Sequence, residues 1–126
     1  MKKRIVNLTQ HQATPEQKED GVFDLAPEGR EKLAALLTFD EPPTAGEICD
    51  RARGIADLTR DRGVNAAMIG GAPYLMSALE NELSAARILP LYSFSRRESV
   101  DTPQPDGSVR KVATFKHAGW VRPPVV

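Results

Sequence analysis

The chain has 126 residues, of which 40% are hydrophobic and 6% aromatic. Seventeen Lys and Arg balance 17 Asp and Glu, and this neutral total excludes a protein that coats DNA with a globally basic surface. A single cysteine excludes a disulfide framework and a multi-cysteine zinc site. No apolar run approaches the ~18 residues that span a membrane, and the apolar stretch after the basic start is too short for a signal peptide. We therefore expect one cytoplasmic domain over residues 1–126.

The first quarter of the chain predicts two short strands around a brief helix. Residues 3–9 and 22–25 turn apolar after polar starts, which is typical of short strands. Between them, residues 14–17 read Thr-Pro-Glu-Gln, a capping box with proline at the first helical position. Gly21 ends this helical turn.

Two helices, a strand and a third helix follow. Leucines at three- and four-residue spacing predict a helix over residues 28–39, and a second capping box opens a helix over residues 44–62. Residues 66–69 form a continuous apolar run, typical of a strand buried on both faces. After a Gly-Gly-Ala-Pro turn at residues 70–73, leucines spaced by four predict the next helix.

The C-terminal third predicts a hairpin. Residues 88–95 and 109–115 have strand composition, and Pro-Asp-Gly at residues 105–107 is a strong turn signal between them. Strands that alternate with helices predict a parallel sheet with right-handed crossovers. The fold class is therefore α/β: a small three-layer Rossmann-like domain, with a mostly parallel sheet and a C-terminal antiparallel hairpin.

Ligands of such sheets bind beyond the carboxyl ends of the strands, and this rule selects residues 9–14, 70–74 and 93–97. Gly70 and Gly71 would let a phosphate approach the backbone at a helix start, although a tight turn without a ligand explains them equally. Ser93, Ser95 and Arg97 alternate onto one side of a predicted strand end, where hydroxyls and a guanidinium suit phosphate oxygens. The alternative is a solvated strand end.

The two histidines and two large aromatic side chains are further candidates. His11 follows the first strand and suits proton transfer, although a surface histidine is the plainer interpretation. His117 lies past the last predicted strand and has a weaker case. Trp120 and Tyr74 could stack on bases, but core or dimer packing is favoured for Trp120 and helix-surface packing for Tyr74.

The opening of the chain carries a family resemblance. Residues 7–17, Asn-Leu-Thr-Gln-His-Gln-Ala-Thr-Pro-Glu-Gln, place a small polar residue and His after a strand and then Thr-Pro-Glu-Gln. This segment resembles small CRISPR-associated proteins of the ring-nuclease type, which are stand-alone relatives of the CARF (CRISPR-associated Rossmann fold) domains. Only this opening matches at residue level, while the order of strands and helices agrees over most of the chain.

The resemblance implies a CARF-like homodimer that binds cyclic oligoadenylate, the second messenger of type III CRISPR defence, and cleaves it without a metal ion or other cofactor. The ribose 2′-hydroxyl would attack the adjacent phosphate, so the protein needs only to hold geometry and stabilise charge. The catalytic candidates are His11, Arg96 and Arg97, and the ligand-binding candidates are Thr9, Gln10, Gly70, Gly71, Ala72, Tyr74, Ser93 and Ser95.

Two other functions stay open. The chain could bind and sequester the same nucleotide without cleaving it. It could also be an interaction subunit, because residues 95–126 hold six bases and three acids, whereas residues 14–61 hold 12 acids and six bases. That basic hairpin would then meet an acidic protein or RNA.

Overall fold

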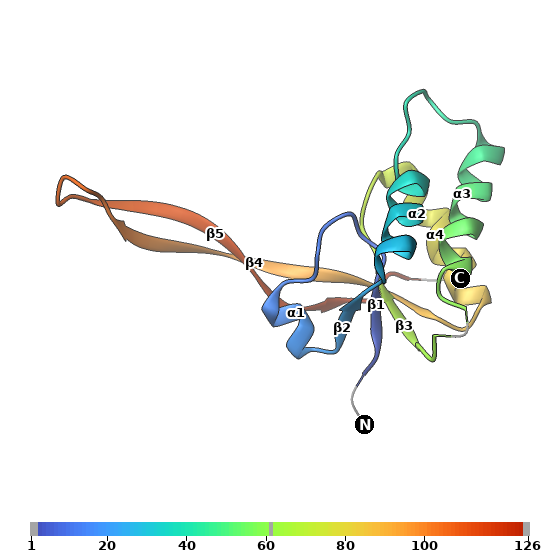
Figure 1. Cartoon of the computed structure of the whole chain (residues 1–126), viewed down its shortest axis with the longest axis horizontal. Coiled ribbons are helices and arrows are strands. Elements are labelled where there is room, and N and C mark those ends of the chain that lie inside the picture. The colour runs from blue at the N-terminus through green and yellow to red at the C-terminus, as the bar shows by residue number, and fades with distance from the viewer. Residues whose placement is uncertain (1–2, 61, 125–126) are drawn as a thin grey trace.

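The computed structural model describes residues 3–60 and 62–124, which form a five-stranded sheet with helices packed on it (Figure 1). The strand order is β2-β1-β3-β4-β5. The first four strands pair in parallel, and β5 pairs antiparallel with β4. The predicted α/β class, mostly parallel sheet and C-terminal hairpin are confirmed. The strands are β1 (Ile5–Asn7), β2 (Val22–Asp24), β3 (Ala66–Met68), β4 (Leu89–Pro103) and β5 (Val109–Val121).

Both predicted capping boxes are present and fix where two of the helices begin. The Thr14 side chain accepts a hydrogen bond from the Gln17 backbone, and the Thr44 side chain does the same for Glu47. The helix after Thr44 ends at Asp57, earlier than the predicted residue 62. The helices are α1 (Pro15–Glu19), α2 (Pro27–Leu37), α3 (Ala45–Asp57) and α4 (Pro73–Ala85).

The core lies mainly on one face of the sheet, under α2, α3 and α4. Alternate residues of each short strand point to opposite faces, so Val6 and Ala67 join the larger cluster whereas Ile5 and Ala66 join the smaller one. The larger cluster includes Leu79 and Leu83, both fully buried. The smaller cluster draws on Ala13 and Trp120 but on no residue of these three helices. The expected three layers are therefore uneven, and core packing of Trp120 is confirmed.

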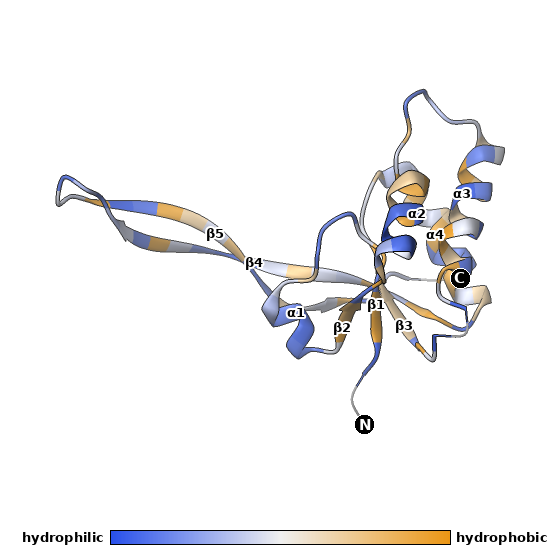
Figure 2. Cartoon of the chain, in the orientation of Figure 1, coloured by the Kyte–Doolittle hydropathy of each residue, from blue (hydrophilic) through white to orange (hydrophobic). Residues whose placement is uncertain are grey.

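The hairpin is much longer than the sequence pattern predicts. β4 continues past residue 95 to Pro103, and β5 past residue 115 to Val121. Residues 96–116, here called the arm, extend away from the body as a two-stranded ribbon (Figure 1). All of them are exposed except the partly buried Thr102 and Gln104. Hydrophobic segments nevertheless recur along the arm (Figure 2).

Where the arm leaves the body, the ladder between β4 and β5 shifts by one residue. Phe94 pairs with Gly119, but Ser95 pairs with His117, so Ala118 is the extra residue of a bulge. Residues directly opposite each other project on the same face of a ribbon. Because Ser93 lies opposite Trp120 and Ser95 opposite His117, the bulge places His117 on the same face as Ser93.

No helix among the described residues is long and apolar enough to cross a bilayer.

Gly21 turns the chain from α1 into β2, and its position excludes a side chain. Its φ is +101°, and a Cβ atom built there would lie 2.1 Å from the carbonyl oxygen of Lys3. Gly63 also has a positive φ, +64°, but a Cβ would meet nothing within 4 Å.

We expect Gly21→Ala to lower the free energy of unfolding by about 3 kcal/mol or more and Gly63→Ala by only about 1 kcal/mol, as measured by urea denaturation. Equal losses would contradict this account.

Candidate functional site

A pocket of about 560 Å³ opens at the carboxyl ends of β1 and β3. The chain passes from β1 to β2 on one side and from β3 to β4 on the other, so the strand order reverses between β1 and β3. This is the point at which open α/β sheets bind ligands. We call it the switch-point pocket; its lining residues are Thr9, Gln10, His11, Gln12, Thr14, Gln17, Met68, Ile69, Gly70, Gly71, Tyr92 and Ser93.

The buried side chain of Asn7 holds the loop that forms one wall of this pocket. Its Nδ2 donates to the His11 carbonyl oxygen at 2.7 Å and to Asp24 Oδ1 at 2.8 Å. Its Oδ1 accepts from the Thr9 N–H at 2.9 Å and the Thr9 hydroxyl at 2.7 Å. Asp24 Oδ1 also accepts from the Ala13 N–H at 3.0 Å. The loop after β1 is therefore fixed at both ends by one network.

The second wall is the turn from β3 into α4. Among the described residues, neither the Gly70 nor the Gly71 N–H donates a hydrogen bond. Ala72 is the N-cap of α4 and supplies no side-chain cap. This wall therefore carries two glycine residues just before α4 whose N–H groups donate to no acceptor among the described residues and can bond anionic oxygen atoms.

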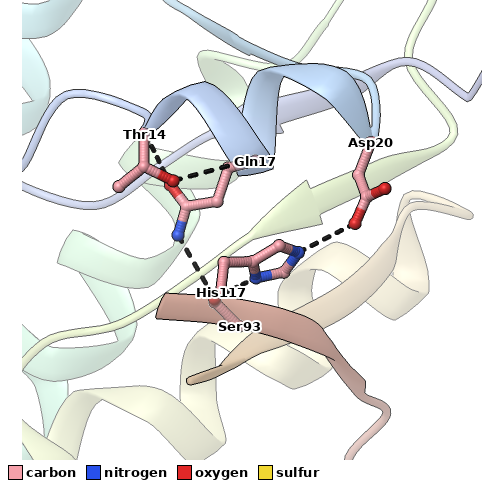
Figure 3. A network of polar contacts seen from close by, with 5 residues as sticks. All are labelled: Thr14, Gln17, Asp20, Ser93 and His117. Carbon is pink, nitrogen blue, oxygen red and sulfur yellow. Dashed lines mark hydrogen bonds and ion pairs between the residues drawn. The ribbon is translucent and has the colours of Figure 1, made fainter. Parts of the chain in front are cut away.

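The third wall is Ser93 on β4, and its hydroxyl belongs to a chain of polar contacts (Figure 3). Ser93 Oγ lies 2.6 Å from His117 Nδ1, and His117 Nε2 lies 2.8 Å from Asp20 Oδ2. Gln17 Nε2 donates to Ser93 Oγ at 3.2 Å. The His117 side chain is 3% exposed, and its ring packs 4.6 Å from that of Trp120. These contacts hold the imidazole in one orientation.

The partners of His117 define its tautomer. An ionised carboxylate only accepts hydrogen bonds, so Nε2 carries the proton that Asp20 binds. In the neutral ring Nδ1 is then an acceptor, and the Ser93 hydroxyl donates to it.

Tyr92 contributes a neutral wall. Burial raises the pKa of Tyr92 well above its ordinary value, and the hydrogen bond to Glu80 and the charge of that carboxylate raise it further. The Tyr92 hydroxyl donates to Glu80 Oε2 at 2.5 Å. The hydroxyl is therefore bonded to Glu80, and it stays protonated near neutral pH.

A smaller hollow of about 280 Å³ lies on the other side of the loop after β1. It shares Thr9, Gln10 and His11 with the switch-point pocket and adds Arg30 from α2. The described residues that line the switch-point pocket include no lysine or arginine, whereas Arg30 lines the neighbouring hollow that shares three of its residues.

The structure brings together six of the candidates from the sequence and leaves five outside the pocket. Those that line the pocket are Thr9, Gln10, His11, Gly70, Gly71 and Ser93. Those that do not line it are Ala72, Tyr74, Ser95, Arg96 and Arg97. Tyr74 packs edge-on against Phe39 with ring centres 5.4 Å apart, as helix-surface packing predicts. The roles of all eleven candidates in binding or catalysis stay predictions.

The expectation that Arg97 lies at a strand end is wrong. β4 continues through residues 96 and 97, which pair with Lys116 and Phe115 at the base of the arm. The polar composition beyond Ser95 suggested a loop, but a solvent-exposed ribbon accepts polar residues on both faces. Within one chain, these two guanidinium groups therefore lie on the arm and not in the pocket wall.

The sequence did not identify Asp20, and it gave His117 little weight. A strand containing both Trp120 and His117 was not predicted past residue 115, so no pattern placed His117 opposite β4. Gln17 had a visible signal as the third residue of a capping box, but this signal predicts a helix start and not a contact with Ser93.

The chain belongs to the family described as uncharacterized protein MJ1673 family, whose model matches residues 3–121. The match covers the switch-point pocket and the arm. The description of the family names no activity. Comparison with curated proteins and with solved structures found no significant match.

Replacement of Asn7 tests whether its carboxamide maintains the pocket wall. We expect Asn7→Ala to lower the free energy of unfolding by about 2 kcal/mol, because it leaves buried partners without hydrogen bonds. Asn81→Ala is the matched control, since Asn81 is exposed on α4 and alanine favours a helix. Urea denaturation measures both, and hydrogen exchange at residues 9–13 should accelerate only in Asn7→Ala. Unchanged exchange would show that other contacts hold the loop.

Proposed function

We propose that this member of the MJ1673 family is a CARF-like cytoplasmic protein that binds cyclic oligoadenylate in the switch-point pocket and cleaves it without a metal ion. The observation that carries the proposal is the pocket itself. It joins the loop after β1, the Gly70-Gly71 turn and Ser93, three segments that are distant in sequence. The first of these segments belongs to residues 7–17, which resemble the opening of the CRISPR-associated ring nucleases.

The chemistry of the walls suits a nucleotide. Unpaired amides at Gly70 and Gly71 can hold phosphate oxygens, and the hydroxyls of Thr9 and Ser93 can bond ribose or phosphate oxygens. Met68, Ile69 and Tyr92 give the same pocket apolar surface against which a base can lie.

Cleavage of such a ring can use a nucleophile from the ligand. The ribose 2′-hydroxyl attacks the neighbouring phosphorus, the 5′-oxygen leaves, and a 2′,3′-cyclic phosphate results. The protein then needs to hold the attacking and leaving oxygens in line and to stabilise charge on the phosphoryl oxygens. His11, exposed at the pocket rim, is the candidate for transferring protons between these oxygens.

The size of the ligand supports a homodimer. A pocket of about 560 Å³ is in the range of sites for one small ligand, whereas cyclic oligoadenylate contains several nucleotides. A two-fold axis would let each copy hold half of the ring.

The arm is the surface proposed to contact the second copy. A lone two-stranded ribbon is marginally stable in water, yet this arm exposes large apolar side chains. Phe115 is 73% exposed and Val109 is 63% exposed. The arm holds five bases and three acids, while residues 14–61 of the body hold an excess of acids, so the two surfaces have complementary charge.

This arrangement also gives Arg96 and Arg97 a role. They lie at the base of the arm, so they would reach a ring held between two copies that meet at this base. Guanidinium groups pair well with phosphate oxygens, and the part of the pocket lining that the structure describes includes no lysine or arginine.

Mixing the protein with cyclic tetra- and hexaadenylate in EDTA tests the function. We expect binding by calorimetry and a linear product with a 2′,3′-cyclic phosphate by chromatography. Gly70→Asp should weaken binding at least about 100-fold, because it brings a carboxylate against the phosphate site. Gly46→Asp is the control with the same change of charge, at an exposed position in the first turn of α3.

Three outcomes would change the conclusion. Failure to bind or cleave either ring would end the proposal. Tight binding with the intact ring recovered after long incubation would favour the sequestering protein. Salt-sensitive binding to an RNA or acidic protein that survives Gly70→Asp, but is lost when Arg110 and Lys111 are changed to Glu, would favour the interaction subunit.

The oligomeric state tests the role of the arm. We expect light scattering to show a dimer, and Phe115→Glu to raise its dissociation constant at least about tenfold by removing a large apolar contact. Tyr74→Glu is the control, because Tyr74 is a half-exposed aromatic residue on the body. A monomeric native protein, or equal effects of both changes, would overturn the assignment.

A further inference from the structure

We propose that Ser93, His117 and Asp20 form a nucleophile–base–positioning triad and that Ser93 attacks the phosphorus atom of a phosphoester bound in the switch-point pocket. This goes beyond the proposed function, because the nucleophile belongs to the protein and the step requires no ribose hydroxyl. It rests on the geometry of the triad and not on the identity of a nucleotide.

The three side chains meet the geometric requirement for an activated serine. Such a site needs a base within hydrogen-bond reach of the hydroxyl and a third group that orients the base. The Ser93 Oγ to His117 Nδ1 distance is 2.6 Å, and the His117 Nε2 to Asp20 Oδ2 distance is 2.8 Å (Figure 3). The residues come from β4, β5 and the end of α1, so only the folded chain assembles them.

The surroundings hold the imidazole in the orientation that a base for Ser93 needs. With Nε2–H donated to Asp20, Nδ1 faces the Ser93 hydroxyl as an acceptor. The ring is almost completely buried and packs against Trp120, so it cannot turn away readily. Asp20 Oδ2 stabilises the positive charge that the ring gains when it takes the proton.

Ser93 is the member of the triad that lines the pocket. Gln17 donates to its oxygen, which leaves a lone pair for attack when the hydroxyl proton moves to His117. The Gly70-Gly71 turn lines the same pocket with unpaired amides, suited to the negative oxygens of a phosphoryl group. A phosphoester carries negative oxygens before the reaction begins, so these amides can bind it in the ground state as well.

The reaction balances in two displacements. In the first, the Ser93 Oγ–phosphorus bond forms while the serine proton moves to His117 Nδ1, and the bond from phosphorus to the leaving oxygen on the opposite side breaks. Water in the pocket protonates the leaving oxygen, and the hydroxide that this produces takes the proton from His117. In the second, water gives a proton to His117 and attacks phosphorus. The Oγ–phosphorus bond then breaks, and Ser93 recovers its proton from His117. The net change is hydrolysis of one phosphoester bond.

A small alkyl fluorophosphonate tests the triad, since a phosphorus electrophile labels an activated serine much faster than an ordinary hydroxyl. We expect mass spectrometry of the full-length protein to find one adduct, on Ser93. The labelling rate should fall about 100-fold or more in His117→Gln and about tenfold or more in Asp20→Asn. Asp20→Glu should recover part of the rate lost in Asp20→Asn, because it restores a carboxylate. Ser99→Ala, at an exposed serine on the same strand, should label at the native rate.

Asp20 is half exposed, so its variants test the triad even if His117→Gln does not fold. Native protein that gains no adduct, or gains it on another residue, overturns the proposal. So does labelling of Ser93 at an unchanged rate in Asp20→Asn. Because the readout uses no nucleotide, it can fail while ring binding succeeds, and ring binding can fail while it succeeds.

Discussion

The buried carboxamide of Asn7 is the constraint on which the rest of the site depends. At the end of β1 it bonds the loop that follows and, through Asp24, the end of β2. The polar groups of Asn7 are almost completely buried, so they must find protein partners, and the loop can adopt few other positions. One wall of each of two neighbouring pockets is set by this single residue.

The elements of the body could be predicted because each has a local cause. The capping boxes at Thr14 and Thr44 begin helices wherever they stand, and the spacing of the leucines selects the buried face. The continuous apolar run at residues 66–69 predicts a strand buried on both faces, and β3 lies between β1 and β4 in the sheet. These signals, together with the rule for open sheets, placed six of the eleven candidate residues in one pocket.

The rest of the site depends on contacts that no local pattern encodes. The bond between His117 and Asp20 joins residues 97 positions apart, and it exists only because β5 passes beside α1. Arg96 and Arg97 lie on the arm because β4 extends past the body, and polar sequence does not distinguish an exposed ribbon from a loop. The sequence thus identified Ser93 as a candidate, but it gave no reason to place His117 and Asp20 beside the Ser93 hydroxyl.

The bulge at Ala118 decides which side chain of β5 lies beside Ser93. In a regular ladder, successive residues alternate between faces, so a histidine three positions before Trp120 would project to the opposite side. One inserted amino acid reverses that alternation and places the imidazole beside Ser93. Relatives whose ribbon lacks this insertion would present a different side chain beneath the serine, and a single deletion could separate two chemistries on the same scaffold.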